Sequence, residues 1–153
     1  MNIEITNQKP QIAVAVKKEN ATMAEISVLA TEGLQKVFCF LAQRGAEIAG
    51  APYLAYSNGN ADFTQFDVEL GIPVSKEIAV GGEFFISKTC EGKSVTATHK
   101  GPYKDVEAVY VALMRYMAEN KLESKGVYYD YYLNNPADVS ESELLTQVVF
   151  PIK

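Results

Sequence analysis

The stretch GVYYDYYLNNP, residues Gly126–Pro136, decides the fold because the chain contains a second version of it. The earlier version is GAPYLAYSNGN, residues Gly50–Asn60. A constant spacing of 76 residues aligns Tyr53 with Tyr129, Tyr56 with Tyr132 and Asn58 with Asn134. Farther along, VELGIPV and TQVVFPI align at a spacing of 78, so that Pro73 matches Pro151. A spacing of about half the chain predicts one structural unit used twice.

Both copies predict the same order of elements, namely strand, helix, strand and strand. The first repeat covers about residues 1–75 and the second about residues 83–153. Neither repeat is large enough to bury a core alone, so we expect a single domain over residues 1–153. The sequence therefore predicts the α+β class, with an antiparallel sheet, two helices on one face of it, and pseudo-twofold symmetry.

In the first repeat, IAVAVKKE (residues 12–19) predicts a strand, and the capping-box spacing of Thr22 and Glu25 predicts the start of a helix. Apolar residues then recur at steps of three and four, as on one face of a helix: Ile26, Leu29, Gly33, Val37 and Leu41. Gly45 predicts the end of this helix. PYLAYS and FTQFDVELGIPV predict the two strands that follow.

In the second repeat, EFFISKTC and KSVTATH predict two strands, with the turn signal Glu91-Gly92 between them. Pro102 predicts the start of the second helix, because proline is favoured in a first helical turn. The buried stripe of that helix is expected at Val106, Val109, Tyr110, Leu113 and Met117. YYDYYLN and LLTQVVFPI predict the closing strands.

Composition indicates a soluble globular protein, since 48% of the 153 residues are hydrophobic and 22% are charged. No apolar run approaches the length of a membrane helix, and the N-terminus MNIEITNQKP lacks a signal peptide's features, so we expect a cytoplasmic protein. A net charge of -5 disfavours direct contact with nucleic acid. Cys39 and Cys90 lack a CxxC spacing and are expected to be reduced thiols.

Asp130 is the one carboxylate among the four tyrosines of GVYYDYYLNNP, and strand alternation predicts where it points. Tyr129, Tyr131 and Leu133 share one face of a strand, which we expect to pack under the helices. Asp130 is then expected to point away from the helices. Alternation in the last strand and the internal repeat add further members to that face. The resulting candidate ligand-binding set is Asp130, Glu69, Gln147, Tyr56, Tyr128 and Tyr132.

Two interpretations of this face remain open. If it is exposed to water, the acids are solvated and the tyrosines are ordinary surface aromatics. If the two repeats curve together, the face becomes a cleft with aromatic walls and acids at its base. Such a cleft would suit a lipophilic cation, because each well-placed ring contributes about 0.5–2 kcal/mol and the acid offsets desolvation of the charge. A neutral aromatic ligand would use the same rings and the polar group of Gln147 or a tyrosine.

Three segments, THKGPY (Thr98–Tyr103), DYYLNNP (Asp130–Pro136) and SELLTQVVFPI (Ser142–Ile152), resemble the signatures of the GyrI-like small-molecule-binding domains. Domains of this family also form the effector-binding halves of AraC-type and MerR-type multidrug-responsive regulators. The resemblance covers essentially the whole chain. It implies a duplicated strand-helix-strand-strand fold with a ligand cleft between the halves. Because Met1 begins almost directly on the first strand, we expect a stand-alone module without a helix-turn-helix domain.

The chain departs from the family signatures at two acidic positions. Asp130 stands where the family usually has the glutamate that meets cationic drugs, and Gln147 stands where it usually has a second glutamate. Some relatives are hydrolases that open cyclopropane rings, so Asp130 and Glu69 are an alternative acid and base pair if both face the cleft. Inhibition of a topoisomerase is a further alternative, suggested by family names alone.

Other chemistry finds little support in the sequence. His99 is the only histidine, too few for a multi-histidine metal site, although carboxylates could in principle hold a hard cation. We expect His99 to be structural at a strand end rather than a member of a Ser-His-Asp triad. The sequence contains no GxGxxG, P-loop or zinc pattern, and Gly81-Gly82 lacks the flanking residues of a phosphate-binding loop, so we expect no cofactor and no metal. We therefore favour a binding module, a ligand sensor or sequestering protein, over an enzyme, and assign no catalytic residue.

Overall fold

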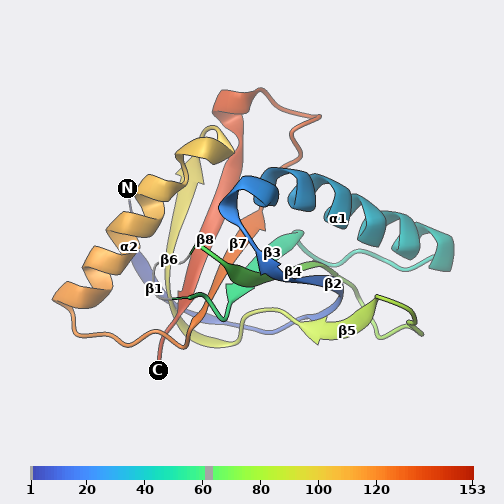
Figure 1. Cartoon of the computed structure of the whole chain (residues 1–153), viewed down its shortest axis with the longest axis horizontal. Coiled ribbons are helices and arrows are strands. Elements are labelled where there is room, and N and C mark those ends of the chain that lie inside the picture. Colours follow the sequence, from blue (N-terminus) through green and yellow to red (C-terminus); the bar gives the residue numbers. More distant parts are fainter. Residues whose placement is uncertain (1, 61–63) are drawn as a thin grey trace. The chain divides into compact units, whose positions relative to one another are not determined.

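The computed structural model describes residues 2–60 and 64–153. The chain divides into two compact units, each with one long helix and four strands (Figure 1). The α1 unit is Pro10–Thr89, and the α2 unit joins Met1–Lys9 to Cys90–Lys153. Every strand pairing within each unit is antiparallel, which confirms the predicted α+β class.

In the α1 unit the strands lie in the order β3-β4-β2-β5, and α1 packs on β2 and β4. The elements are β2 (Ile12–Ala21), α1 (Met23–Arg44), β3 (Tyr53–Ser57), β4 (Phe66–Pro73) and β5 (Phe85–Lys88). The buried residues Val14, Val16, Val68 and Leu70 supply the apolar layer of β2 and β4. The order of strand, helix, strand and strand predicted for the first repeat is therefore present in this unit.

Both ends of α1 form as the sequence predicts. Thr22 is the N-cap, and Glu25 Oε1 accepts hydrogen bonds of 3.1 Å from the backbone N–H and the hydroxyl of Thr22. At the other end, Gly45 adopts a φ of 65° and its N–H donates to the carbonyl of Ala42. Glycine pays no Cβ penalty in this left-handed conformation, which explains why the helix ends there.

In the α2 unit the strands lie in the order β1-β6-β8-β7. The elements are β1 (Glu4–Gln8), β6 (Gly92–Lys100), the 3-10 helix η1 (Tyr103–Asp105), α2 (Glu107–Glu119), β7 (Val127–Tyr132), the 3-10 helix η2 (Glu141–Glu143) and β8 (Leu145–Pro151). Pro102 is the N-cap of η1, which leads directly into α2. The proline therefore marks the helical start that the sequence predicts.

The α2 unit has a continuous core between its helix and strands. The predicted stripe of α2 supplies Val109, Leu113 and Met117. The strands supply Val95, Ala97, Val148 and Phe150, and Ile152 follows β8. Burial of such aliphatic side chains contributes roughly 1.5–3 kcal/mol each, so this cluster fixes α2 on β6 and β8.

The internal repeat reappears in the backbone hydrogen bonds that follow each helix. Ala46 N donates to Leu41 O at 3.0 Å, and Leu122 N donates to Met117 O at 2.9 Å. Later in each copy the isolated bridges Ile48↔Val74 and Ser124↔Ile152 occupy matching positions. The same sequence pattern therefore produces the same local structure twice.

The outer strand of each unit comes from outside the matching repeat. β1 precedes β2 in the chain but pairs with β6, whereas β5 precedes β6 but pairs with β2. The strands predicted on either side of Glu91-Gly92 therefore do not form a hairpin with each other. A turn signal fixes where the chain bends but not which strand edge it then joins.

Among the helices of the described residues, none has the length and hydrophobicity of a membrane-spanning segment.

Candidate functional site

Asp130 points toward α2, contrary to the prediction from strand alternation. Its direct partner across β7 and β8 is Val148, a member of the core beneath α2. The Tyr110 hydroxyl, from α2, donates a hydrogen bond of 2.5 Å to Asp130 Oδ1. Asp130 is only 4% exposed. The prediction placed Tyr129, Tyr131 and Leu133 under the helices. It was wrong, because Leu133 is 45% exposed and therefore does not lie under a helix.

Tyr128 and Tyr132 lie on the same helix-facing side as Asp130. The Tyr128 ring packs edge-on against Phe150, with 4.7 Å between ring centroids, and its hydroxyl accepts a hydrogen bond from Ser124. The Tyr132 ring contacts Tyr103 of η1 at 5.2 Å. Tyr132 therefore links β7 to η1, whereas Tyr128 links β7 to β8 and to the loop that precedes β7.

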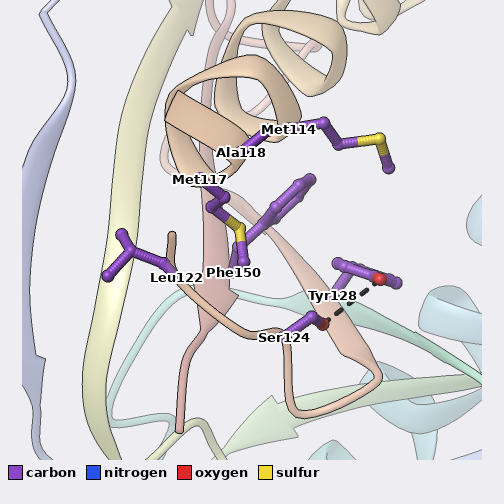
Figure 2. A pocket seen from close by; sticks show the side chains of 7 residues that line it. All are labelled: Met114, Met117, Ala118, Leu122, Ser124, Tyr128 and Phe150. Carbon is purple, nitrogen blue, oxygen red and sulfur yellow. Dashed lines mark hydrogen bonds between the residues drawn. The ribbon is translucent and has the colours of Figure 1, made fainter. Parts of the chain in front are cut away.

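A groove of about 270 Å³ opens beside the C-terminal half of α2 (Figure 2). It is lined by Met114, Met117, Ala118, Leu122, Ser124, Tyr128 and Phe150. The groove is largely apolar, and none of its lining residues carries a charge. Of the predicted site residues, only Tyr128 contributes to it.

Tyr56, in the α1 unit, also lies on the helix-facing side. It pairs with Val68 and contacts the Phe66 ring at 5.4 Å, and it is 6% exposed. Leu70, on the same side of β4 as Val68, contacts α1: a Cβ added to Gly33 of α1 would lie 2.8 Å from Leu70 Cδ2. The side that contains Tyr56 therefore faces α1. Four of the six predicted residues therefore lie on the helix side of their own unit.

Glu69 and Gln147 lie on the opposite side, which we call the helix-free face of each unit. Glu69 alternates with Val68 and Leu70, both of which are buried on the α1 side. Gln147 is paired with Tyr131 and alternates with Val148 of the α2 core. The sequence therefore predicted the orientation of these two residues, and their role in binding stays a prediction.

Glu69 is held by two hydroxyl groups that sequence reasoning missed. Tyr53 Oη donates to Glu69 Oε2 at 2.6 Å, and Ser87 Oγ donates to the same oxygen at 2.8 Å. Glu69 remains partly exposed, whereas Tyr53 is fully buried. The only signal in the sequence was the alternation of side chains along each strand. It places Tyr53 and Glu69 on the same face of neighbouring strands, with Glu69 two residues away from the strand partner of Tyr53.

Gly71 makes the Tyr53 contact sterically possible. Tyr53 and Gly71 are directly paired, and a Cβ on Gly71 would lie 2.6 Å from both Cζ and Oη of Tyr53. The tyrosine ring therefore lies across β4 at a place where any larger residue would collide with it. This is the close approach that often explains a glycine inside a strand.

Two other charged residues lie near Glu69 on the helix-free face of the α1 unit. Lys17 of β2 is directly opposite Glu69, and Asp67 precedes it by two residues on β4. Asp67 accepts hydrogen bonds from the Asn58 side chain and from the backbone N–H of Asn20. These two bonds lower the pKa of Asp67 below its ordinary value.

The helix-free face of the α2 unit carries stacked tyrosines. The rings of Tyr129 and Tyr131 are 5.8 Å apart at an interplanar angle of 9°. Tyr131 Oη accepts a hydrogen bond from the backbone N–H of Cys90. Burial raises the pKa of the Cys90 thiol. The rings on the same face as Gln147 are thus the half-buried Tyr129 and the buried Tyr131, whereas the prediction chose Tyr128 and Tyr132.

His99 has a local structural contact, in agreement with its expected position at the end of a strand. Its Nε2 lies 2.9 Å from the carbonyl oxygen of Pro102. This contact spans the turn between β6 and η1.

A family model for a GyrI-like small molecule binding domain matches residues 1–153. The chain belongs to this GyrI-like family. Small-molecule binding is therefore the property that this GyrI-like domain shares with its family. No curated protein matches the chain significantly.

Solved structures have the same fold as this GyrI-like domain. The EcmrR C-terminal domain matches with a TM-score of 0.85 and 16% identity, covering 99% of this chain and 97% of that one. EcmrR in its DNA complex, solved by cryo-EM in EcmrR-RPo, matches with a TM-score of 0.85 and 18% identity, covering 99% and 57%. The chain thus spans little more than half the length of EcmrR in that complex. SAV2435 bound to tetraphenylphosphonium matches with a TM-score of 0.69 and 10% identity, covering 100% and 94%.

Proposed function

We propose that this GyrI-like domain binds small aromatic or lipophilic molecules, cations included, at its helix-free faces. The observation that carries the proposal is the Glu69 carboxylate, which is partly exposed and is held by the hydroxyls of Tyr53 and Ser87. A fixed carboxylate on a strand is a rigid polar anchor for a ligand. The family membership supplies the wider class of ligand.

The helix-free face of the α2 unit offers aromatic rings of its own to a ligand. Tyr129 and Tyr131 form a stacked pair on the helix-free face of the α2 unit, and Gln147 lies beside Tyr131. A cation over such a ring gains about 0.5–2 kcal/mol, and a neutral aromatic gains from stacking and burial. The structural relative SAV2435 with its bound tetraphenylphosphonium supports cations as test ligands.

We further propose that the chain senses or sequesters its ligand without contacting DNA itself. The net charge of -5 disfavours phosphate contacts. A DNA-binding partner or domain would read the ligand signal in a regulatory role, as a comparison with the EcmrR–DNA complex suggests.

The orientation of Asp130 argues against the enzymatic alternative, in which Asp130 and Glu69 act as acid and base. That hypothesis required Asp130 and Glu69 both to point away from the helices. Asp130 instead points toward α2, where it bonds to Tyr110. We therefore expect bound ligands to be recovered unchanged.

A ligand panel tested by thermal shift and by amide NMR would examine the binding proposal. Hydrophobic cations and neutral aromatics are expected to raise the melting temperature and to shift resonances of β4 and β7 residues on the helix-free faces. Glu69→Gln should weaken the cations more than the neutral ligands. Shifts confined to the groove beside α2, or no binding by any ligand, would contradict the proposal.

A further inference from the structure

We infer that Glu69 selects ligands that carry a protonated amine with an N–H group over quaternary cations of the same size and charge. This inference rests on the proposed function, because it requires a ligand on the helix-free face of the α1 unit. It specifies which cations bind there and which atom recognises them.

The two oxygens of Glu69 have different surroundings. Oε2 accepts from both Tyr53 Oη and Ser87 Oγ, at 2.6 and 2.8 Å. Oε1 accepts no hydrogen bond from any residue that the structure describes. A carboxylate offers about four lone-pair positions, so Oε1 keeps its full capacity as an acceptor. Glu69 is partly exposed, and its Oε1 is not a buried oxygen without a partner, so a ligand in solution can approach this oxygen.

The two hydroxyl donors fix the direction in which Oε1 points. Tyr53 is fully buried, and its ring is seated against Gly71. Ser87 lies on β5, where it pairs with Ala13 of β2. Glu69 is therefore held from β3 on one side and from β5 on the other. This arrangement makes Oε1 a preorganised acceptor, and Tyr53 and Ser87 are positioning residues.

A preorganised acceptor distinguishes between two kinds of monocation. A protonated amine can donate an N–H to Oε1, and charge-assisted hydrogen bonds are roughly twice as strong as neutral ones. A quaternary ammonium or phosphonium ion has no such donor, and its alkyl groups keep the positive charge farther from the oxygen. Because one hydrogen bond to a charged group contributes about 1.5–3 kcal/mol, the amine should bind at least about tenfold more tightly.

The charges around Glu69 are compatible with a bound cation. Lys17 lies directly opposite Glu69 but forms no ion pair with it in the described part of the chain. Asp67 lies on the same face, two residues away. These three side chains carry a combined formal charge of -1. The Lys17 ammonium repels a cation bound at Glu69, so Lys17→Gln is expected to increase the affinity for the amine.

The test compares N,N-dimethylbenzylamine with benzyltrimethylammonium, which are both monocations at neutral pH and differ by one methyl group. Calorimetric titration of the whole chain should give an affinity at least about tenfold higher for the amine. Glu69→Gln should bring the two affinities to within about twofold. Tyr53→Phe keeps the ring but removes the hydroxyl that donates to Glu69. It should therefore reduce the ratio of the amine affinity to the quaternary-cation affinity, and it should retain binding of benzyl alcohol. Ser87→Ala should reduce the ratio in the same way, whereas Thr31→Ala, on the exposed surface of α1, should not change it.

The outcomes separate the inference from the proposed function. Equal affinities of the two cations for the unmodified chain would overturn the inference and leave small-molecule binding intact. A ratio that persists in Glu69→Gln would also overturn it, because another acceptor would then be responsible. Failure of both cations and of benzyl alcohol to bind would overturn the inference and the proposed helix-free site together. Far-ultraviolet circular dichroism of each variant would verify that it is folded.

Discussion

At the scale of single residues, Tyr110 and Asp130 connect α2 to β7 through one hydrogen bond. Tyr110→Phe keeps the ring contact with Phe150 but removes a donor from a buried carboxylate. Loss of a partner from a buried polar group costs about 1–3 kcal/mol, so urea unfolding should show a decrease of this size. Tyr116→Phe, on the same helix, is the matched control and should change the free energy of unfolding by less than about 0.5 kcal/mol. Equal losses in both variants would contradict the assigned role of Asp130.

Asp67 gives a prediction for the effect of pH on stability. Its oxygens accept hydrogen bonds from Asn20 N and Asn58 Nδ2, two asparagines with φ values of 55° and 52°. The pKa of Asp67 is lowered in the folded state, so its contribution is fully present above the unfolded pKa and is lost as pH falls through the folded pKa. The melting temperature of the unmodified chain should therefore decrease in this acidic range more than that of Asp67→Asn. If the melting temperatures of the unmodified chain and of Asp67→Asn change in parallel with pH, ionisation of Asp67 does not contribute to stability. Asp138→Asn, in an exposed loop, provides the control.

Single residues also show where sequence reasoning about the site reached its limit. Tyrosine has an apolar ring and a polar hydroxyl, so it is compatible with either face of a strand. Alternation grouped Tyr128, Asp130 and Tyr132 correctly, but the sequence did not show which face the group occupies. The register with Val148 decides it, and register depends on a partner strand. Glu69 was oriented correctly because both of its neighbours, Val68 and Leu70, are plainly apolar.

At the scale of elements, the helices were predictable because their signals are local. Thr22, Glu25 and Gly45 define the ends of α1 through contacts within a few residues. The strands were also predictable as strands, but the partners of β1 and β5 were not. Pairing of β5 with β2 joins segments far apart in the chain, and only tertiary packing selects between such edges.

β4 gives a prediction about how one glycine supports the candidate site. Gly71→Ala places a methyl group 2.6 Å from the Tyr53 ring, so the ring or the strand must move. Overpacking of this kind typically costs about 1–3 kcal/mol, and displacement of Tyr53 Oη should also weaken amine binding at Glu69. Gly81→Ala is the matched control, because no heavy atom lies within 4 Å of its added Cβ. Thermal unfolding and the calorimetric titration should both distinguish the two variants, and unchanged amine binding in Gly71→Ala would contradict the positioning role of Tyr53.

At the scale of the whole molecule, the duplicated plan is completed by an exchange of outer strands. Each unit contains the strand-helix-strand-strand order of one repeat, as the sequence predicts. Each also includes a strand that lies immediately before the first strand of the other repeat in the chain. A repeat taken from the sequence alone therefore lacks one strand of its unit. The first nine residues were assigned to the first repeat by position, yet they belong to the α2 unit.

The exchange predicts a specific effect of removing the N-terminal strand. Deletion of residues 2–8 removes β1 and leaves the outer edge of β6 without its pairing partner, and it also removes Ile3, which packs against the α2 core. Hydrogen exchange should therefore accelerate in β6 although β6 lies more than 80 residues away in the chain. β2, which follows β1 directly in sequence but pairs with β4 and β5, should keep its protection. If hydrogen exchange accelerates in β2 and not in β6, then β1 stabilises its own repeat, contrary to the strand pairing described. A chain that lacks only Lys153 controls for the effect of shortening a terminus.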